Sequence, residues 1–216
     1  MDQVQVHPTV QQDTPHAYLI GEAVRGEGAI LVNKHGDRFV NELDTRKNVT
    51  AAIDGLKENG AYLIFDQGIR DRAKAVEFYD SIGLVHTGKS LDDLAGQLGF
   101  DAAALKKAVA DWNTAVADQN DAALNRTTGM ERDISTAPFF AIHIAPAVHY
   151  TMGGIAINHK TEVLNDDGKA IKGLYAAGEI VGGLHGNNRI GGNSIAETVI
   201  FGRQAGEQVF NYINQK

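Results

Sequence analysis

The chain has 216 residues, 43% of them hydrophobic, and its 20 Lys and Arg against 27 Asp and Glu give a formal net charge of −7. These values are typical of a globular protein with one or two domains, and the acidic balance argues against nucleic acid or an anionic membrane as its main partner. With no cysteine, disulfides, thiolate catalysis, iron–sulfur clusters and cysteine-based zinc sites are excluded; neither a run of 18 apolar residues nor a signal-peptide core occurs, so we predict no membrane span.

The first predicted element is a strand over residues 4–10. It carries His7, which the following proline holds in extended geometry, and the simplest expectation for this histidine is a strand end facing solvent. Because chemistry-bearing residues seldom lie so close to an N-terminus, we expect the chain to be part of a longer polypeptide. Residues 18–25 predict a short helix with Glu22 and Arg25 on one face.

Residues 29–40 predict two short strands joined by a polar turn at 33–36. A charged stretch follows, in which Arg46 has Asp44 and Glu42 as its nearest partners along the sequence.

The middle of the chain has a different, helix-rich character. A buried strand is predicted over 61–66 and an amphipathic helix over 71–79. Ser90 and Gly99 have the positions of a helix cap and a helix stop, and Asp101 is placed to cap an alanine-rich helix over 102–117. Trp112 on this helix is expected in the core.

The last third begins with a strand over 139–144, followed by an apolar approach to His149 and a pair of glycines. A glycine-rich stretch, residues 178–194, lies between a strand-like run and a final helix. Such a loop lets backbone approach a flat or bulky group, and a helix N-terminus is a site for anions or dipoles. Ser194 and Glu197 have the spacing of a capping box, and Gly202 and Gly206 predict close helix packing.

Three histidines and three arginines lie beside glycine- or proline-bearing breaks in the chain. They are His7, His149, His185, Arg25, Arg46 and Arg189. In an acidic protein, such a local set of cations suits a small carboxylate substrate. A metal site is the weaker alternative, because no HxxxH-type pair occurs, and the serine hydrolase elbow G-x-S-x-G is absent.

Six motifs then occur in the order of one known family. They are Val6–Thr9, Gly21–Gly26, Phe39–Arg46, His149–Gly154, Ala176–Glu179 and His185–Ser194. Together they resemble the flavoprotein of the fumarate reductase and succinate dehydrogenase family, in particular its soluble, flavocytochrome c-like fumarate reductases. Each motif is weak alone, but the ordered set is highly specific and covers the chain from end to end.

The resemblance implies an FAD enzyme that reduces the double bond of an unsaturated dicarboxylate, fumarate to succinate, by hydride transfer from the flavin and protonation by the protein. At the matching positions, His149 and Arg189 bind substrate carboxylates and His7 helps to orient them. The proton donor is Arg46, to which Glu22 and Arg25 relay protons. The residues implied to hold FAD are Glu179 at the ribityl chain and Gly191, Gly192, Asn193, Ser194 and Ile195 at the pyrimidine edge.

An arginine is an unusual acid, because a guanidinium has a pKa above about 12. The role requires a dry site crowded with other cations. The alternative is that Arg46 only stabilises negative charge developing on the substrate.

Two departures from the family pattern change the expectation. Gly21 stands where these fumarate reductases usually carry a hydroxyl residue that helps to hold a carboxylate, so a urocanate- or acrylate-like acid is an alternative substrate. The chain also lacks the early G-x-G-x-x-G unit that binds the ADP half of FAD, and a CxxCH haem motif.

The fold class implied is therefore α+β: the C-terminal part of an FAD-binding, glutathione reductase-like domain (1–24 and 146–216) with an inserted α+β capping domain (25–145). Two functions stay open, namely the catalytic part of a flavin-dependent reductase and a non-catalytic folded fragment. The expected partner is a small dicarboxylate, with no nucleic acid and an unnamed electron donor. The expected location is cytoplasmic, with the periplasm as the alternative.

Overall fold

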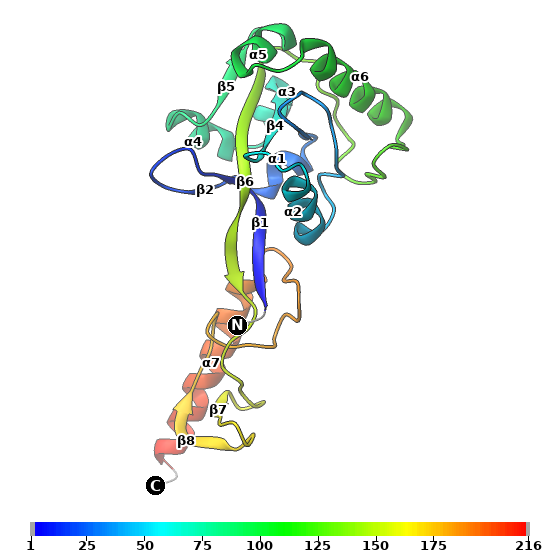
Figure 1. Ribbon diagram of the computed structural model, residues 1–216. Coiled ribbons are helices and arrows are strands. Elements are labelled where there is room, and N and C mark those ends of the chain that lie inside the picture. The colour runs from blue at the N-terminus through cyan, green and yellow to red at the C-terminus, as the bar shows by residue number, and fades with distance from the viewer. Residues whose placement is uncertain (1–2, 215–216) are drawn as a thin grey trace. The chain divides into compact units, whose positions relative to one another are not determined.

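The computed structural model describes residues 3–214, which pack as two compact units. One unit extends from His7 to Ala147, and the other joins the residues before His7 to those from Val148 onward. Helices and strands combine as the predicted α+β class (Figure 1). The expected division into 1–24 with 146–216 and 25–145 concerns functional domains and stays a prediction.

A six-stranded sheet forms the centre of the larger unit. The strands are β1 (Val4–Gln11), β2 (Tyr18–Leu19), β3 (Ile30–Val32), β4 (Ala61–Asp66), β5 (His86–Gly88) and β6 (Phe139–Thr151). Their order is β2-β1-β6-β4-β3, and β5 also pairs with β6. Strand β4 matches the predicted strand residue for residue and pairs with β6 from Ala61–Ile144 to Asp66–Phe139.

The larger unit also contains six helices. They are α1 (Glu22–Gly26), α2 (Arg46–Gly55), α3 (Gln67–Arg70), α4 (Ala75–Ser81), α5 (Leu91–Leu98) and α6 (Ala102–Asp118). Helices α5 and α6 lie side by side (Figure 1). The Ser90 hydroxyl accepts from the Asp93 N–H, Gly99 ends α5 with a φ of 73°, and Asp101 accepts from two N–H groups of α6. These predicted caps are confirmed.

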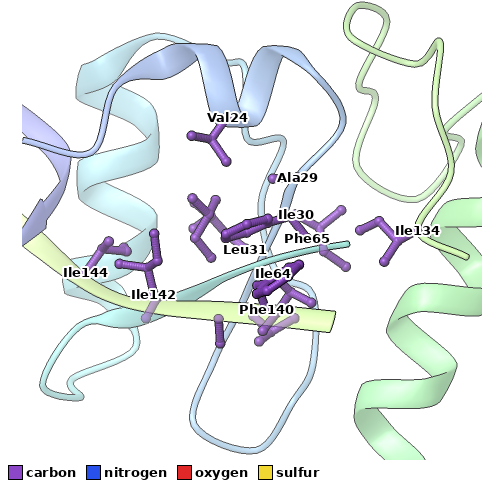
Figure 2. Packing of buried hydrophobic residues seen from close by; sticks show 14 of the residues in the cluster. Val24, Ala29, Ile30, Leu31, Ile64, Phe65, Ile134, Phe140, Ile142 and Ile144 are labelled. Carbon is purple, nitrogen blue, oxygen red and sulfur yellow. The ribbon is translucent and has the colours of Figure 1, made fainter. Parts of the chain in front are cut away.

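The core of this unit combines side chains of β3, β4 and β6 with buried side chains of the helices. Figure 2 shows side chains of these strands packed together, among them Leu31, Ile64 and Phe140. Phe65 and Phe140 stack with ring centroids 5.3 Å apart. Trp112 of α6 is fully buried, as predicted.

Several local predictions for this unit were wrong. Residues 18–19 form a strand, so the helix begins only at Glu22. The second strand of the 29–40 pair reduces to one bridge between Val32 and Arg38. The helix expected over 71–79 is interrupted, because α3 ends at Arg70 and α4 begins at Ala75.

The smaller unit contains β7 (Glu162–Leu164) paired with β8 (Ala170–Tyr175), and helix α7 (Asn193–Asn214). Helix α7 lies against β8 (Figure 1). Gly202 and Gly206 were predicted to allow close packing, but a Cβ at either position would have no atom within 4 Å. Apolar side chains of α7 such as Val199 and Phe210 are exposed. No helix within residues 3–214 is both long and apolar enough to cross a membrane.

Candidate functional site

Glu22 and Arg46, two of the predicted proton-transfer residues, form an ion pair. Arg46 Nε donates to Glu22 Oε1 over 2.8 Å, although the residues are 24 apart in sequence. Glu22 is thus a partner of Arg46 in addition to the two residues, Asp44 and Glu42, that proximity in sequence had suggested as candidates. Burial works to raise the pKa of Glu22, but the hydrogen bond and charge of Arg46, with Arg25 and His7, lower it overall.

Arg25 lies beside this pair as a buried cation with 2% of its surface exposed. Its Nη1 donates to the Glu42 carbonyl over 2.6 Å, while Nε and Nη2 have no partner among the described residues. Burial above all lowers the pKa of Arg25 to about 10. The cations Arg46 and Arg126 act in the same direction, against the pull of nearby carboxylates. The dry, cation-crowded condition required for an acidic arginine is therefore found at Arg25.

A buried charge cluster, which the sequence did not reveal, holds Arg25 in place. Arg126 Nη2 donates to the Arg25 carbonyl over 2.6 Å, and Nη1 donates to Glu42 Oε2 over 2.9 Å. Glu42 also accepts from Arg38 Nε at 2.7 Å. The guanidinium carbons of Arg38 and Arg126 lie 4.8 and 4.3 Å from the Trp112 ring centroid. We call Arg38, Glu42, Trp112 and Arg126 the Trp112 cluster.

His7 belongs to the same unit and is buried, with 1% of its surface exposed. The expectation of a solvent-facing histidine was therefore wrong. The Thr9 N–H donates to His7 Nδ1 over 3.3 Å. Since a backbone N–H can only donate, Nδ1 is the accepting ring nitrogen in this contact.

Gly21, the position that departs from the family pattern, contacts a tyrosine of α4. Its N–H donates to the Tyr79 hydroxyl over 3.1 Å, and Tyr79 is buried. A Cβ at Gly21 would lie 3.7 Å from this hydroxyl, an ordinary contact. A hydroxyl group therefore lies beside Gly21 although the glycine has none of its own.

The predicted substrate-binding residues Arg189 and His149 lie in the smaller unit. Arg189 is buried, and its guanidinium carbon is 4.4 Å from the ring centroid of Tyr150. His149 precedes this tyrosine on β6 and is half-buried. His185 and Tyr150 form an edge-on pair with ring centroids 5.7 Å apart. Tyr150 lies within the His149–Gly154 motif, but no role and none of these contacts was predicted for it.

The glycine-rich stretch meets the end of β6 through close backbone contacts. The Ile155 N–H donates to the Ile180 carbonyl at 2.8 Å, and the Gly182 N–H donates back to the Ile155 carbonyl at 3.0 Å. A Cβ on Gly154 would lie 2.2 Å from the Ile180 oxygen. The predicted close approach is thus partly to the chain's own backbone.

Glu179 is exposed, and its Oε1 accepts from the Thr151 N–H over 2.8 Å. The segment 191–195 comprises the two turn residues before α7 and the first residues of the helix; it is largely exposed, and Gly192 has a φ of 84°. The predicted capping box at Ser194 is not formed, because Glu197 Oε2 instead accepts from the Tyr150 hydroxyl and contacts His185 Nε2 at 2.7 Å. Tertiary contacts therefore override the local capping pattern.

Comparison with known proteins places these residues in a family. A model described as "FAD binding domain" matches residues 1–195. This chain belongs to that FAD-binding-domain family. The cofactor that the match indicates is FAD.

Relatives of this FAD-binding-domain chain share its sequence over nearly its full length. It is 50% identical over 208 residues to an NADH:fumarate oxidoreductase of Klebsiella pneumoniae, covering 96% of the chain and 22% of that protein. A solved open conformation of a flavocytochrome c3 fumarate reductase is 45% identical, with a TM-score of 0.76, covering 98% of the chain and 37% of that structure. An NADH:acrylate oxidoreductase of Vibrio harveyi (35% identical) and a urocanate reductase of Eggerthella lenta (34%) also match, over 91% and 95% of the chain and 20% and 35% of those proteins. The chain thus spans between about a fifth and two-fifths of the length of these relatives.

The exposed residues around the start of α7 fit a flavin. The apolar side chains of Ile190, just before the helix, and Ile195, in its first turn, are both 72% exposed. These side chains could make apolar contacts with a flat ring. The helix N-terminus favours the negative charge that a reduced flavin carries at its pyrimidine edge. Glu179 is within the same unit, with an exposed carboxylate suited to hydroxyl groups.

Proposed function

We propose that this chain carries the substrate-binding and proton-delivering residues of a flavin-dependent reductase, which reduces the C=C bond of an unsaturated dicarboxylate, fumarate to succinate. The observation that supports it most is the Glu22–Arg46 ion pair beside the buried, low-pKa Arg25. An ion pair meant only for stability needs no second guanidinium with unpartnered buried nitrogens next to it.

In this proposal Arg46 protonates the substrate carbon. Arg46 is mostly shielded, with 11% of its side chain exposed, whereas the Glu22 side chain is 46% exposed. Glu22 therefore accepts a proton from solvent or from Arg25 and returns it to Arg46 through their shared hydrogen bond. Burial lowers the pKa of Arg25, so Arg25 gives up a proton to this pathway more readily than an exposed arginine would.

The remaining residues bind and orient. Arg189 and His149 neutralise substrate carboxylates, and His7 helps to orient them. Glu179 and the segment 191–195 would hold FAD, which when bound supplies the hydride. Arg46 retains a second role in stabilising negative charge that develops on the substrate.

A second substrate class is favoured by Gly21. The Gly21 N–H is engaged with the Tyr79 hydroxyl, so glycine here offers a carboxylate neither a side-chain donor nor this amide. Weaker binding of the second carboxylate would open the site to monocarboxylates of the acrylate or urocanate type. Among relatives that match this chain are proteins named for those two substrates.

The test begins with an FAD titration of the chain, followed by reoxidation of the reduced flavin by fumarate, acrylate or urocanate. We expect fumarate to reoxidise the flavin, Arg46→Met to slow this step at least about 100-fold, in line with loss of a general acid, and the neighbouring exposed Lys47→Met to leave it unchanged. Equal rates in the two variants would refute the role of Arg46. Failure to bind FAD would identify a non-catalytic fragment.

A further inference from the structure

One carboxylate, Glu197, joins three elements of the smaller unit. It lies on α7 with 4% of its surface exposed, and its Oε2 accepts from the Tyr150 hydroxyl of β6. The same oxygen lies 2.7 Å from Nε2 of His185 on the glycine-rich stretch. Its other oxygen, Oε1, is buried without a partner among the described residues. A buried carboxylate is costly unless donors are aimed at it, so these contacts constrain all three elements.

The carboxylate acts on Arg189 through Tyr150. The guanidinium of Arg189 lies over the Tyr150 ring, 4.4 Å from its centroid, in cation–π geometry. Burial, followed by the hydrogen bond to Glu197, raises the pKa of Tyr150 well above its usual value. The hydroxyl therefore stays protonated and donates, and Glu197 fixes the direction of the ring that supports Arg189.

The constraint on Tyr150 also affects its neighbour His149. His149 and Tyr150 are consecutive on β6, so their side chains leave the strand on opposite faces. Holding Tyr150 in one rotamer therefore restricts the strand end from which His149 projects. His185 packs edge-on against the same ring and shares the carboxylate, which leaves the ring little freedom to turn.

We propose that Glu197 is a positioning residue, which orients Arg189 through Tyr150 for the substrate carboxylate. The inference rests on the proposed function for its catalytic consequence, but the orientation itself does not. Glu197 touches neither substrate nor cofactor in this scheme. Losing it leaves the chemical groups in place and loosens the binding geometry, so substrate affinity falls more than the rate at saturation.

The catalytic test uses the flavin-loaded protein and two conservative variants. Tyr150→Phe keeps the ring but removes the hydroxyl, and Glu197→Gln keeps the shape but removes the charge. We expect each to raise the KM for fumarate about 5-fold or more, to change kcat less than about 2-fold, and to be non-additive in combination. The control Tyr175→Phe on β8, half-buried and outside these contacts, leaves KM unchanged. Unchanged KM in both variants, with a lower melting temperature, would leave Glu197 a purely structural role and overturn the proposal.

A second readout needs no flavin. A guanidinium stem held over an aromatic ring experiences a ring current, so the Arg189 δ-methylene protons should resonate upfield in the NMR spectrum of the free chain. We expect this shift to shrink in Tyr150→Phe and Glu197→Gln, although both keep an aromatic ring at position 150, and to persist in Tyr175→Phe. A shift preserved in both test variants would refute the positioning role. If the wild-type chain shows the shift but reduces no unsaturated acid, the proposed function fails while the positioning by Glu197 stands.

Discussion

Replacing Arg126 by methionine tests the Trp112 cluster. The Arg126 side chain is fully buried and makes five hydrogen bonds, which run to Glu42 Oε2 and to the carbonyls of Ala29, Arg25, Gly129 and Thr128 at 2.6–3.0 Å. Methionine keeps most of the stem and leaves these acceptors without a donor. The Glu42 carboxylate keeps only Arg38 and the Leu31 N–H as donors among the described residues.

The expected loss follows from the burial of this pair. Removing one partner of a buried, hydrogen-bonded ion pair costs about 3–5 kcal/mol, because the other charge stays buried. Arg72→Met is the matched control, since Arg72 also pairs with a glutamate, Glu27 at 3.1 Å, but has 57% of its side chain exposed. An exposed pair contributes about 0–1 kcal/mol.

Urea unfolding followed by tryptophan emission is the appropriate assay. Trp112 is the only tryptophan, and two guanidinium groups lie on its ring, so its fluorescence reports this cluster directly. We expect the free energy of unfolding to fall by about 3–5 kcal/mol in Arg126→Met and by less than about 1 kcal/mol in Arg72→Met. Equal losses in both variants would refute the assignment of Arg126 as a buried structural cation.

Three further predictions concern single positions. Arg46→Met should raise the pKa of Glu22 in a carboxylate NMR titration, and an unchanged pKa would contradict the pairing. In the wild-type protein the folded-state pKa of Glu22 is lowered, so the stabilisation from this pair is present above the unfolded-state pKa and is lost as the pH falls through the folded-state pKa. Gly154→Ala should lower the free energy of unfolding in urea by about 1–3 kcal/mol, because its Cβ would lie 2.2 Å from a backbone oxygen. Gly202→Ala on exposed α7 should raise it by about 0.5–1 kcal/mol. Equal effects of the two substitutions would refute the close backbone approach at Gly154. Gly21→Ser should change the unfolding free energy by less than about 0.5 kcal/mol and raise the preference for fumarate over acrylate; an unchanged preference would argue against Gly21 as a specificity determinant.

The sequence by itself determined the locally encoded features. Ser90, Gly99 and Asp101 act within a few residues of themselves, so their caps and the helices between them were predictable. Strand β4 was predictable because its apolar run is short, continuous and bounded. The six motifs also carried the family, because a family signature is a property of residue order.

Only the tertiary structure decided which charged groups meet. Arg46 pairs with Glu22, and Glu197 accepts from Tyr150 in place of the local capping partner, at separations of 24 and 47 residues. A capping box contributes about 1 kcal/mol at an exposed helix start, whereas a buried carboxylate left without donors costs more. Glu197 therefore keeps its buried donors, and this preference depends on burial, which is a property of the packed chain. For the same reason, the low pKa of Arg25 and the burial of His7 could not be predicted from the sequence, because desolvation depends on neighbours that are distant in sequence.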